Sequence, residues 1–161
     1  MSTFRCRRDS DIEDFLRNKA IPFEKAHKGR TYLVVGKESA ESKELRIQAY
    51  FSLALSNMRI QKGVSRTQRK RLNGIFADDL VPCFLIGQLA RNDQHPEEIG
   101  GDEIVAHAMS ICKMGHDLVG GRFVRVDCRD IPGLVDFYER NGFRRLQTDD
   151  KTGLLQLVRF I

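Results

Sequence analysis

Residues 81–128 read VPCFLIGQLARNDQHPEEIGGDEIVAHAMSICKMGHDLVGGRFVRVDC, and this stretch decides the fold. Residues 81–90 and 122–128 are apolar and rich in β-branched and aromatic side chains, which predicts two strands. Between them, residues 102–118 carry apolar side chains at helical spacing, and Gly120-Gly121 ends that pattern. Because strand–helix–strand crossovers are right-handed, we expect the two strands to lie parallel.

The segment before this unit predicts a helix and a hairpin. Ser10, followed three residues later by Glu13, is a capping-box pattern, and it predicts a helix over 11–19 that ends before Pro22. Residues 31–36 and 46–55 then read as two strands. The polar stretch 37–44 between them predicts a turn, so the pair is expected to be antiparallel.

The remaining elements complete one domain over residues 1–161. A short helix is expected near 66–72, and Pro132 can start another helix that Asn141-Gly142 ends. Residues 143–147 and 154–161 read as the last two strands. The order predicts an α/β (α+β) fold with a mixed, mostly antiparallel sheet.

Composition excludes several classes of protein. The chain has 161 residues, of which 41% are hydrophobic, so it can build a core without metals or disulfides. It contains no apolar run near the roughly 20 residues of a membrane helix. Its first fifteen residues lack the apolar core of a signal peptide, so we expect a cytoplasmic protein without a membrane partner.

The cysteines and histidines spell no metal motif. The four cysteines form no CxxC pair and the four histidines no HExxH, so we expect no metal. In a cytoplasmic protein the cysteines are expected to be reduced thiols. Those at positions 83, 112 and 128 are expected to lie in the core.

The basic charge is concentrated in one segment, residues 59–77. The chain has a net charge of +5 and this segment holds six cations and no acid, so the rest carries about −1. Such a segment suits either a solvated surface or a phosphate-binding edge for RNA. The RNA hypothesis names Arg66, Arg69, Lys70 and Arg71.

The order of elements, together with FYERNGF at 137–143, resembles the GNAT superfamily of acetyl-CoA-dependent N-acetyltransferases. The resemblance covers residues 30–161, and FYERNGF matches the family's FYExxGF pattern. It implies a central sheet in which two parallel strands splay apart, with helices on both faces. It also implies acetyl-CoA as the co-substrate.

The resemblance assigns coenzyme-binding residues. The pantetheine arm would pair with Leu89, Ala90 and Arg91, and the pyrophosphate would lie at the helix start formed by Gly100, Gly101 and Asp102. The loop departs from the family pattern, because Pro96 and Ile99 replace two of its usual residues. It also lacks Lys and Arg between 92 and 103, and is crowded with carboxylates at 93, 97, 98, 102 and 103.

The same resemblance makes Tyr138 the catalytic residue, close to the coenzyme sulfur. Full proton transfer from a phenol of pKa about 10 to a thiolate of pKa about 8.5 is uphill by about 2 kcal/mol. We therefore expect Tyr138 to act as a hydrogen-bond donor, against the alternative of a buried aromatic. The general base stays open among Asp93, His95, Tyr50 and Ser52. Asp130 is expected to cap the helix that follows it or to take part in a turn.

Three functions are compatible with the sequence. The first is acetyl transfer to a primary amine of unknown identity, by direct attack in a ternary complex. The second is a toxin of a toxin–antitoxin pair that acetylates the α-amine of aminoacyl-tRNA, since small family members of that kind resemble this chain in size. The third is a catalytically degenerate binding module. A homodimer is compatible with each.

Overall fold

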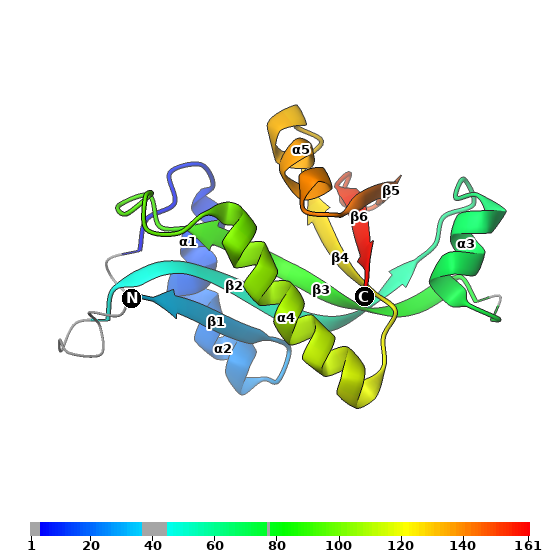
Figure 1. Cartoon of the computed structure of the whole chain (residues 1–161), viewed down its shortest axis with the longest axis horizontal. Coiled ribbons are helices and arrows are strands. Elements are labelled where there is room, and N and C mark those ends of the chain that lie inside the picture. The colour runs from blue at the N-terminus through cyan, green and yellow to red at the C-terminus, as the bar shows by residue number, and fades with distance from the viewer. Residues whose placement is uncertain (1–3, 37–44, 77) are drawn as a thin grey trace. The chain divides into compact units, whose positions relative to one another are not determined.

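The computed structural model describes residues 4–36, 45–76 and 78–161. The strands form one six-stranded sheet in the order β1-β2-β3-β4-β6-β5 (Figure 1). β3 and β4 are parallel, and the pairs β1·β2, β4·β6 and β5·β6 are antiparallel. This confirms the predicted mixed, mostly antiparallel sheet.

In chain order the elements are α1 (Ser10–Asp14), the π-helix η1 (Phe15–Lys19), α2 (Ala20–Lys25), β1 (Arg30–Val35), β2 (Ile47–Arg59), α3 (Arg66–Asn73), β3 (Leu80–Arg91), α4 (Gly101–Val119), β4 (Phe123–Cys128), α5 (Pro132–Arg140), β5 (Arg144–Thr148) and β6 (Leu155–Phe160).

The chain forms two compact units. The first comprises residues 1–54 and 87–108, and the second comprises residues 55–86 and 109–161. In the described part of the chain, no helix has the length and apolar character needed to cross a membrane.

In the first unit, the N-terminal helix differs from the prediction in two ways. Its N-cap is Asp9 and not Ser10, because the Asp9 carboxylate accepts a hydrogen bond from the Asp11 amide at 3.0 Å. The helix also continues through Pro22, where an end was expected. The π-turn of η1 precedes the proline and shifts the backbone bonding to a five-residue step, from the Ala20 amide to the Phe15 carbonyl. Such a turn accommodates a ring that clashes with the carbonyl four residues back in a regular α-helix.

The predicted antiparallel pair of strands is confirmed, with Tyr32 opposite Phe51 in the register of β1 and β2. The turn predicted over 37–44 lies outside the described residues. A buried cluster beneath this pair is built around Tyr50, whose ring meets that of Phe4 edge-on at 5.2 Å. The cluster fixes the N-terminal helical segment against β2 and the end of β3, and consists of Phe4, Cys6, Phe15, Leu16, Ala20, Ile47, Tyr50 and Ala90.

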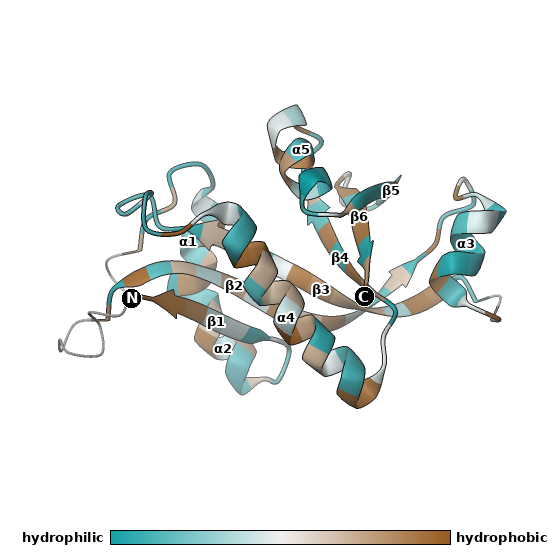
Figure 2. Ribbon diagram, viewed as in Figure 1, coloured by the Kyte–Doolittle hydropathy of each residue, from teal (hydrophilic) through white to brown (hydrophobic). Residues whose placement is uncertain are grey.

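In the second unit, the parallel ladder between β3 and β4 joins Phe84–Ile86 to Val124–Val126. The α4 helix begins in the first unit and continues from residue 109 in the second. It alternates apolar and polar patches along its length, as predicted from its spacing (Figure 2). It ends at Val119, before Gly120 and Gly121, whose φ angles of 81° and 108° suit glycine. The predicted glycine stop is therefore confirmed.

A second cluster holds α3 to the sheet of this unit. Leu72 from α3 and Met58 from β2 are fully buried in it, beside Val158 from β6. The remaining members are Ile60, Val64, Val81, Cys83 and Phe123. The short helix predicted near 66–72 is confirmed as α3, and Ser65 and Gln68 form a capping box at its start.

Candidate functional site

The segment assigned to coenzyme binding begins at the end of β3, in the first unit. Ala90 is buried in the Tyr50 cluster, while Leu89 and Arg91 are half-buried. The Arg91 guanidinium donates to the carbonyl of Pro96 at 2.9 Å and so holds the following loop. The parallel ladder with β4 involves Phe84–Ile86, and β3 continues beyond it to Arg91.

Asn92, which follows β3, is the anchor of this loop, and its role was not predicted. The side chain is 1% exposed. Its Nδ2 donates to the Ile47 carbonyl at 2.8 Å, and its Oδ1 accepts from the amides of Arg5 and Gln94, both at 3.1 Å. The sequence signal for this role is an amide side chain directly after an apolar strand. At that position the side chain can form hydrogen bonds with the backbone.

The carboxylates of the loop have partners elsewhere in the first unit. Asp93 accepts a hydrogen bond from the Arg7 amide at 2.7 Å. Glu98 forms an ion pair with Arg46, whose guanidinium also contacts the His95 ring at 3.2 Å. Residues from the N-terminal part of the chain therefore engage two of the five carboxylates noted in the sequence, Asp93 and Glu98.

Gly100, Gly101 and Asp102 lie where α4 begins. The helix starts at Gly101, and the Ile104 amide donates to the Gly100 carbonyl at 3.2 Å. A Cβ added at Gly100 would meet nothing within 4 Å, so the space beside it is open. Asp102 is exposed in the first turn. The positive end of the helix dipole therefore lies at the predicted glycines.

Among the four base candidates, Tyr50 is excluded. It is fully buried, its hydroxyl donates to the Ile12 carbonyl at 2.5 Å, and burial raises its pKa far above the ordinary value. Ser52 is buried on β2 and lies close to Gly87. A Cβ added at Gly87 would be 3.2 Å from the Ser52 Oγ. Asp93 and His95 lie in the loop with the partners described above. No base is assigned on this basis.

Tyr138 lies in the second unit, on α5. Pro132 occupies the first turn of that helix, as predicted, and Gly142 follows its end with a φ of 84°. The Phe143 amide donates back to the Tyr138 carbonyl at 3.1 Å, and the two rings meet edge-on at 5.6 Å. FYERNGF therefore folds as a helix end closed by a glycine turn.

The Tyr138 phenol is 8% exposed. Burial raises its pKa well above 10, and charge on Cys128 adds to the increase. At neutral pH the phenol is therefore protonated, which suits a hydrogen-bond donor.

Asp130 was predicted to cap α5 or to take part in a turn, and it does not cap the helix. The N-cap residue is Ile131, which makes no side-chain capping bond. Asp130 instead pairs with Arg145 at 3.3 Å. The capping prediction was wrong, because the carboxylate is engaged by Arg145 of β5, fifteen positions later.

The basic helix α3 is hydrophilic over most of its surface (Figure 2). Its four predicted RNA-binding cations differ in surroundings. Arg69 is engaged within the unit, donating to Asp79 at 2.6 Å and to the Val64 carbonyl at 3.2 Å. Arg71 lies over the Phe160 ring at 4.2 Å, and Arg66 and Lys70 are exposed.

The predicted core thiols are buried, at Cys83, Cys112 and Cys128. Burial raises their pKa values to about 11, 12 and 11. In the described ranges, no group of three or more His, Cys, Asp or Glu is arranged to hold a metal ion.

Comparison with protein-family models and with curated proteins gives no match. Comparison with solved structures gives several. A tyrosine-to-phenylalanine mutant of KacT is 23% identical, with a TM-score of 0.75 over 96% of this chain and 85% of that one. AtaT complexed with acetyl-methionyl-tRNAfMet is 19% identical, with a TM-score of 0.75 over the same shares. AtaTR bound with AcCoA is 20% identical, with a TM-score of 0.72 over 96% and 84%. The chain thus has the GNAT-like fold that the sequence analysis expected.

Proposed function

We propose that this chain is an acetyl-CoA-dependent N-acetyltransferase acting on a primary amine. The observation that carries the proposal is the fold shared over 96% of the chain with a structure that binds AcCoA. Two features support it. The loop carboxylates Asp93 and Glu98 already have partners, and the helix start at Gly101 favours an anion.

We assign coenzyme binding in two parts. Leu89, Ala90 and Arg91 would pair with the pantetheine arm through their backbone, as an added strand. Gly100, Gly101 and Asp102 would hold the pyrophosphate through the first-turn amides of α4.

In the proposed reaction the amine attacks the thioester carbonyl, so that the C–N bond forms as the C–S bond breaks. The amine loses one proton, and coenzyme A leaves as the thiol. Tyr138 would donate a hydrogen bond to the departing sulfur, which supplies about 10²–10⁴ in rate at most. Because its raised pKa makes full proton loss costly, the proton that reaches the thiol comes ultimately from the amine.

Calorimetry with acetyl-CoA and turnover by Tyr138→Phe test the proposal together. We expect acetyl-CoA to bind both proteins equally and the variant to turn over at least about tenfold more slowly. Tyr32→Phe is the matched control, because Tyr32 stacks on Phe51 in β2 at 5.1 Å and should not affect turnover. Absence of acetyl-CoA binding would favour the non-catalytic binding module instead. Equal turnover would remove Tyr138 from the mechanism.

A second candidate function is acetylation of the α-amine of aminoacyl-tRNA, as by a toxin. It is favoured by the likeness to AtaT complexed with acetyl-methionyl-tRNAfMet and by the basic helix α3. An α-amine of pKa about 7.8 is neutral in more than about a tenth of molecules at pH 7, whereas a lysine amine is neutral in about one in 2,500. Such an acceptor therefore needs no strong base.

Acetyl transfer to methionyl-tRNA, compared with methionine amide, tests this candidate. Both present a similar α-amine, so a preference of about 100-fold in kcat/KM for the tRNA would measure recognition of the RNA. Equal efficiencies would reject the tRNA as the substrate and leave the acetyltransferase proposal intact.

A further inference from the structure

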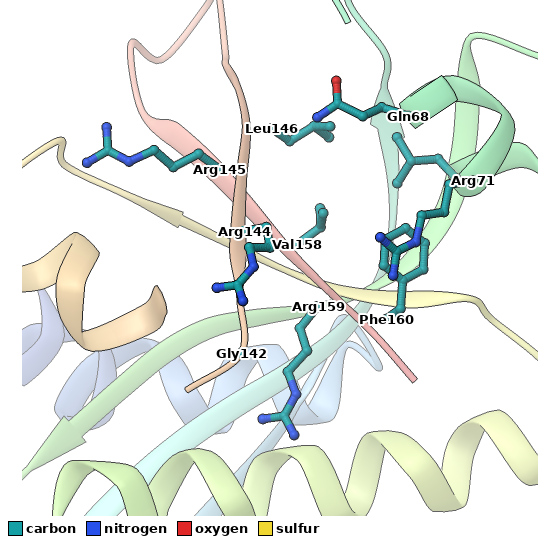
Figure 3. A pocket seen from close by; sticks show the side chains of 10 residues that line it. Gln68, Arg71, Gly142, Arg144, Arg145, Leu146, Val158, Arg159 and Phe160 are labelled. Carbon is teal, nitrogen blue, oxygen red and sulfur yellow. The ribbon is translucent and has the colours of Figure 1, made fainter. Parts of the chain in front are cut away.

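The second unit contains a pocket that none of the residues proposed for acetyl transfer line. It has a volume of about 340 Å³ and lies between α3, β5 and β6 (Figure 3). This is within the range of small-molecule sites. Its lining residues are Gln68, Arg71, Leu72, Gly142, Arg144, Arg145, Leu146, Val158, Arg159 and Phe160.

The pocket carries four guanidinium groups, and none of its lining residues is acidic. Arg145 is balanced by Asp130 and by Glu139, at 3.3 and 3.5 Å. In Figure 3 its side chain extends away from Arg71, Arg144 and Arg159. The charge of the pocket is therefore set mainly by those three.

The three remaining arginines contact neutral groups. Arg71 lies over the Phe160 ring, and Arg159 donates to the Asn141 carbonyl at 2.8 Å. Among the described residues, Arg144 makes long contacts of 3.4 Å to the carbonyls of Glu139 and Phe143. Three positive charges that line one pocket favour an anion there.

Beneath the arginines, the pocket has an apolar floor. Leu72 and Val158 are 1% and 4% exposed and belong to the buried cluster that ties α3 to the sheet. Leu146 and Phe160 pack against the same cluster. Since the floor belongs to the core, the floor is fixed before a ligand arrives, which reduces the entropic cost of binding.

We propose that this pocket binds a nucleoside phosphate. Guanidinium groups pair with phosphate oxygens, and a base or ribose would lie on the apolar floor or stack on the guanidinium plane of Arg71. The volume admits one nucleotide unit. A free nucleotide and one unit of an RNA strand present the same chemistry, and the inference does not depend on acetyl transfer.

Fluorescence anisotropy with a labelled short single-stranded RNA, with ATP as competitor and no acetyl-CoA, tests the proposal. Arg71→Gln and Arg144→Gln should each raise the Kd about tenfold. The control is Lys113→Gln, which removes one positive charge from an exposed position of α4 outside both the pocket and the basic segment 59–77. It should change the Kd less than about threefold. Unchanged melting temperatures would show that the variants are folded, and Arg144 is the safer position because its contacts are weak.

The outcomes separate the sources of the ligand. Displacement of the RNA by ATP assigns a free nucleotide, and binding of RNA without such displacement assigns a strand; either supports the proposal. It is overturned if Lys113→Gln weakens binding as much as Arg71→Gln, or if an acidic peptide binds where RNA and ATP do not. A loss of acetyl-CoA affinity in Arg144→Gln would make the pocket part of the coenzyme site and would also overturn it. Failure on any of these counts leaves the Tyr138 test unaffected.

Discussion

Replacing Asn92 with alanine should destabilise the first unit and loosen the loop that leads into α4. Asn92 is 1% exposed. Its side chain donates one buried hydrogen bond to the Ile47 carbonyl and accepts two partly buried ones from the backbone amides of Arg5 and Gln94. Alanine leaves all three backbone groups without this partner. A small cavity forms as well, since the site lies against the Tyr50 cluster through the neighbouring Ala90.

The magnitude follows from the burial of each bond. The buried Ile47 carbonyl costs about 1–3 kcal/mol when it loses its donor, and each partly buried bond contributes about 0.5–1.5 kcal/mol. We therefore expect a loss of about 4 kcal/mol in the free energy of unfolding. With about 0.34 kcal/mol/K of unfolding entropy for 161 residues, this lowers Tm by about 12 °C.

Thermal unfolding followed by circular dichroism measures the effect. Gln94→Ala is the control, because its side chain is exposed while its backbone amide still donates to Asn92. Asn92→Asp keeps the acceptor for the two amides but places a buried carboxylate oxygen against the Ile47 carbonyl, so its Tm should also fall below that of the wild type. If Asn92→Ala melts within about 1 °C of Gln94→Ala, Asn92 does not anchor the loop.

Three further predictions concern packing, pH and thiol reactivity. Gly121→Ala should cost about 2–4 kcal/mol in chemical denaturation, because the new Cβ would lie 2.6 Å from a Phe84 ring carbon at a φ of 108°. A hydrogen bond from the Cys6 amide, followed by the nearby arginines, lowers the pKa of Glu13 below its ordinary value of 4.5. The stability that this carboxylate adds is therefore present at pH 7 and is lost as the pH falls through its pKa in the folded protein. The difference in urea midpoint between wild type and Glu13→Gln should therefore be larger at pH 7 than at pH 3. A thiol reagent at pH 8 should react rapidly only after denaturation, because burial raises the pKa values of Cys83, Cys112 and Cys128.

Much of the fold was predictable because its signals are local. The apolar runs gave the strands, the helical spacing gave α4, and Pro132 and Gly142 bounded α5 through backbone restrictions that belong to those residues themselves. The candidate site was less predictable. Whether Glu98 opposes a phosphate depends on Arg46, which lies 52 residues away in the chain, and no local pattern joins the two.

The sequence by itself determined the strand–helix–strand unit, the hairpin and the glycine turn after Tyr138, since periodicity and residue-specific φ preferences act over a few neighbouring residues. Only the tertiary structure decided that the helix passes Pro22, that Asp130 pairs with Arg145, and that arginines from three separate elements line one pocket. These outcomes depend on which groups compete for the same partner at close range. That competition takes place only after segments distant in the chain have packed together.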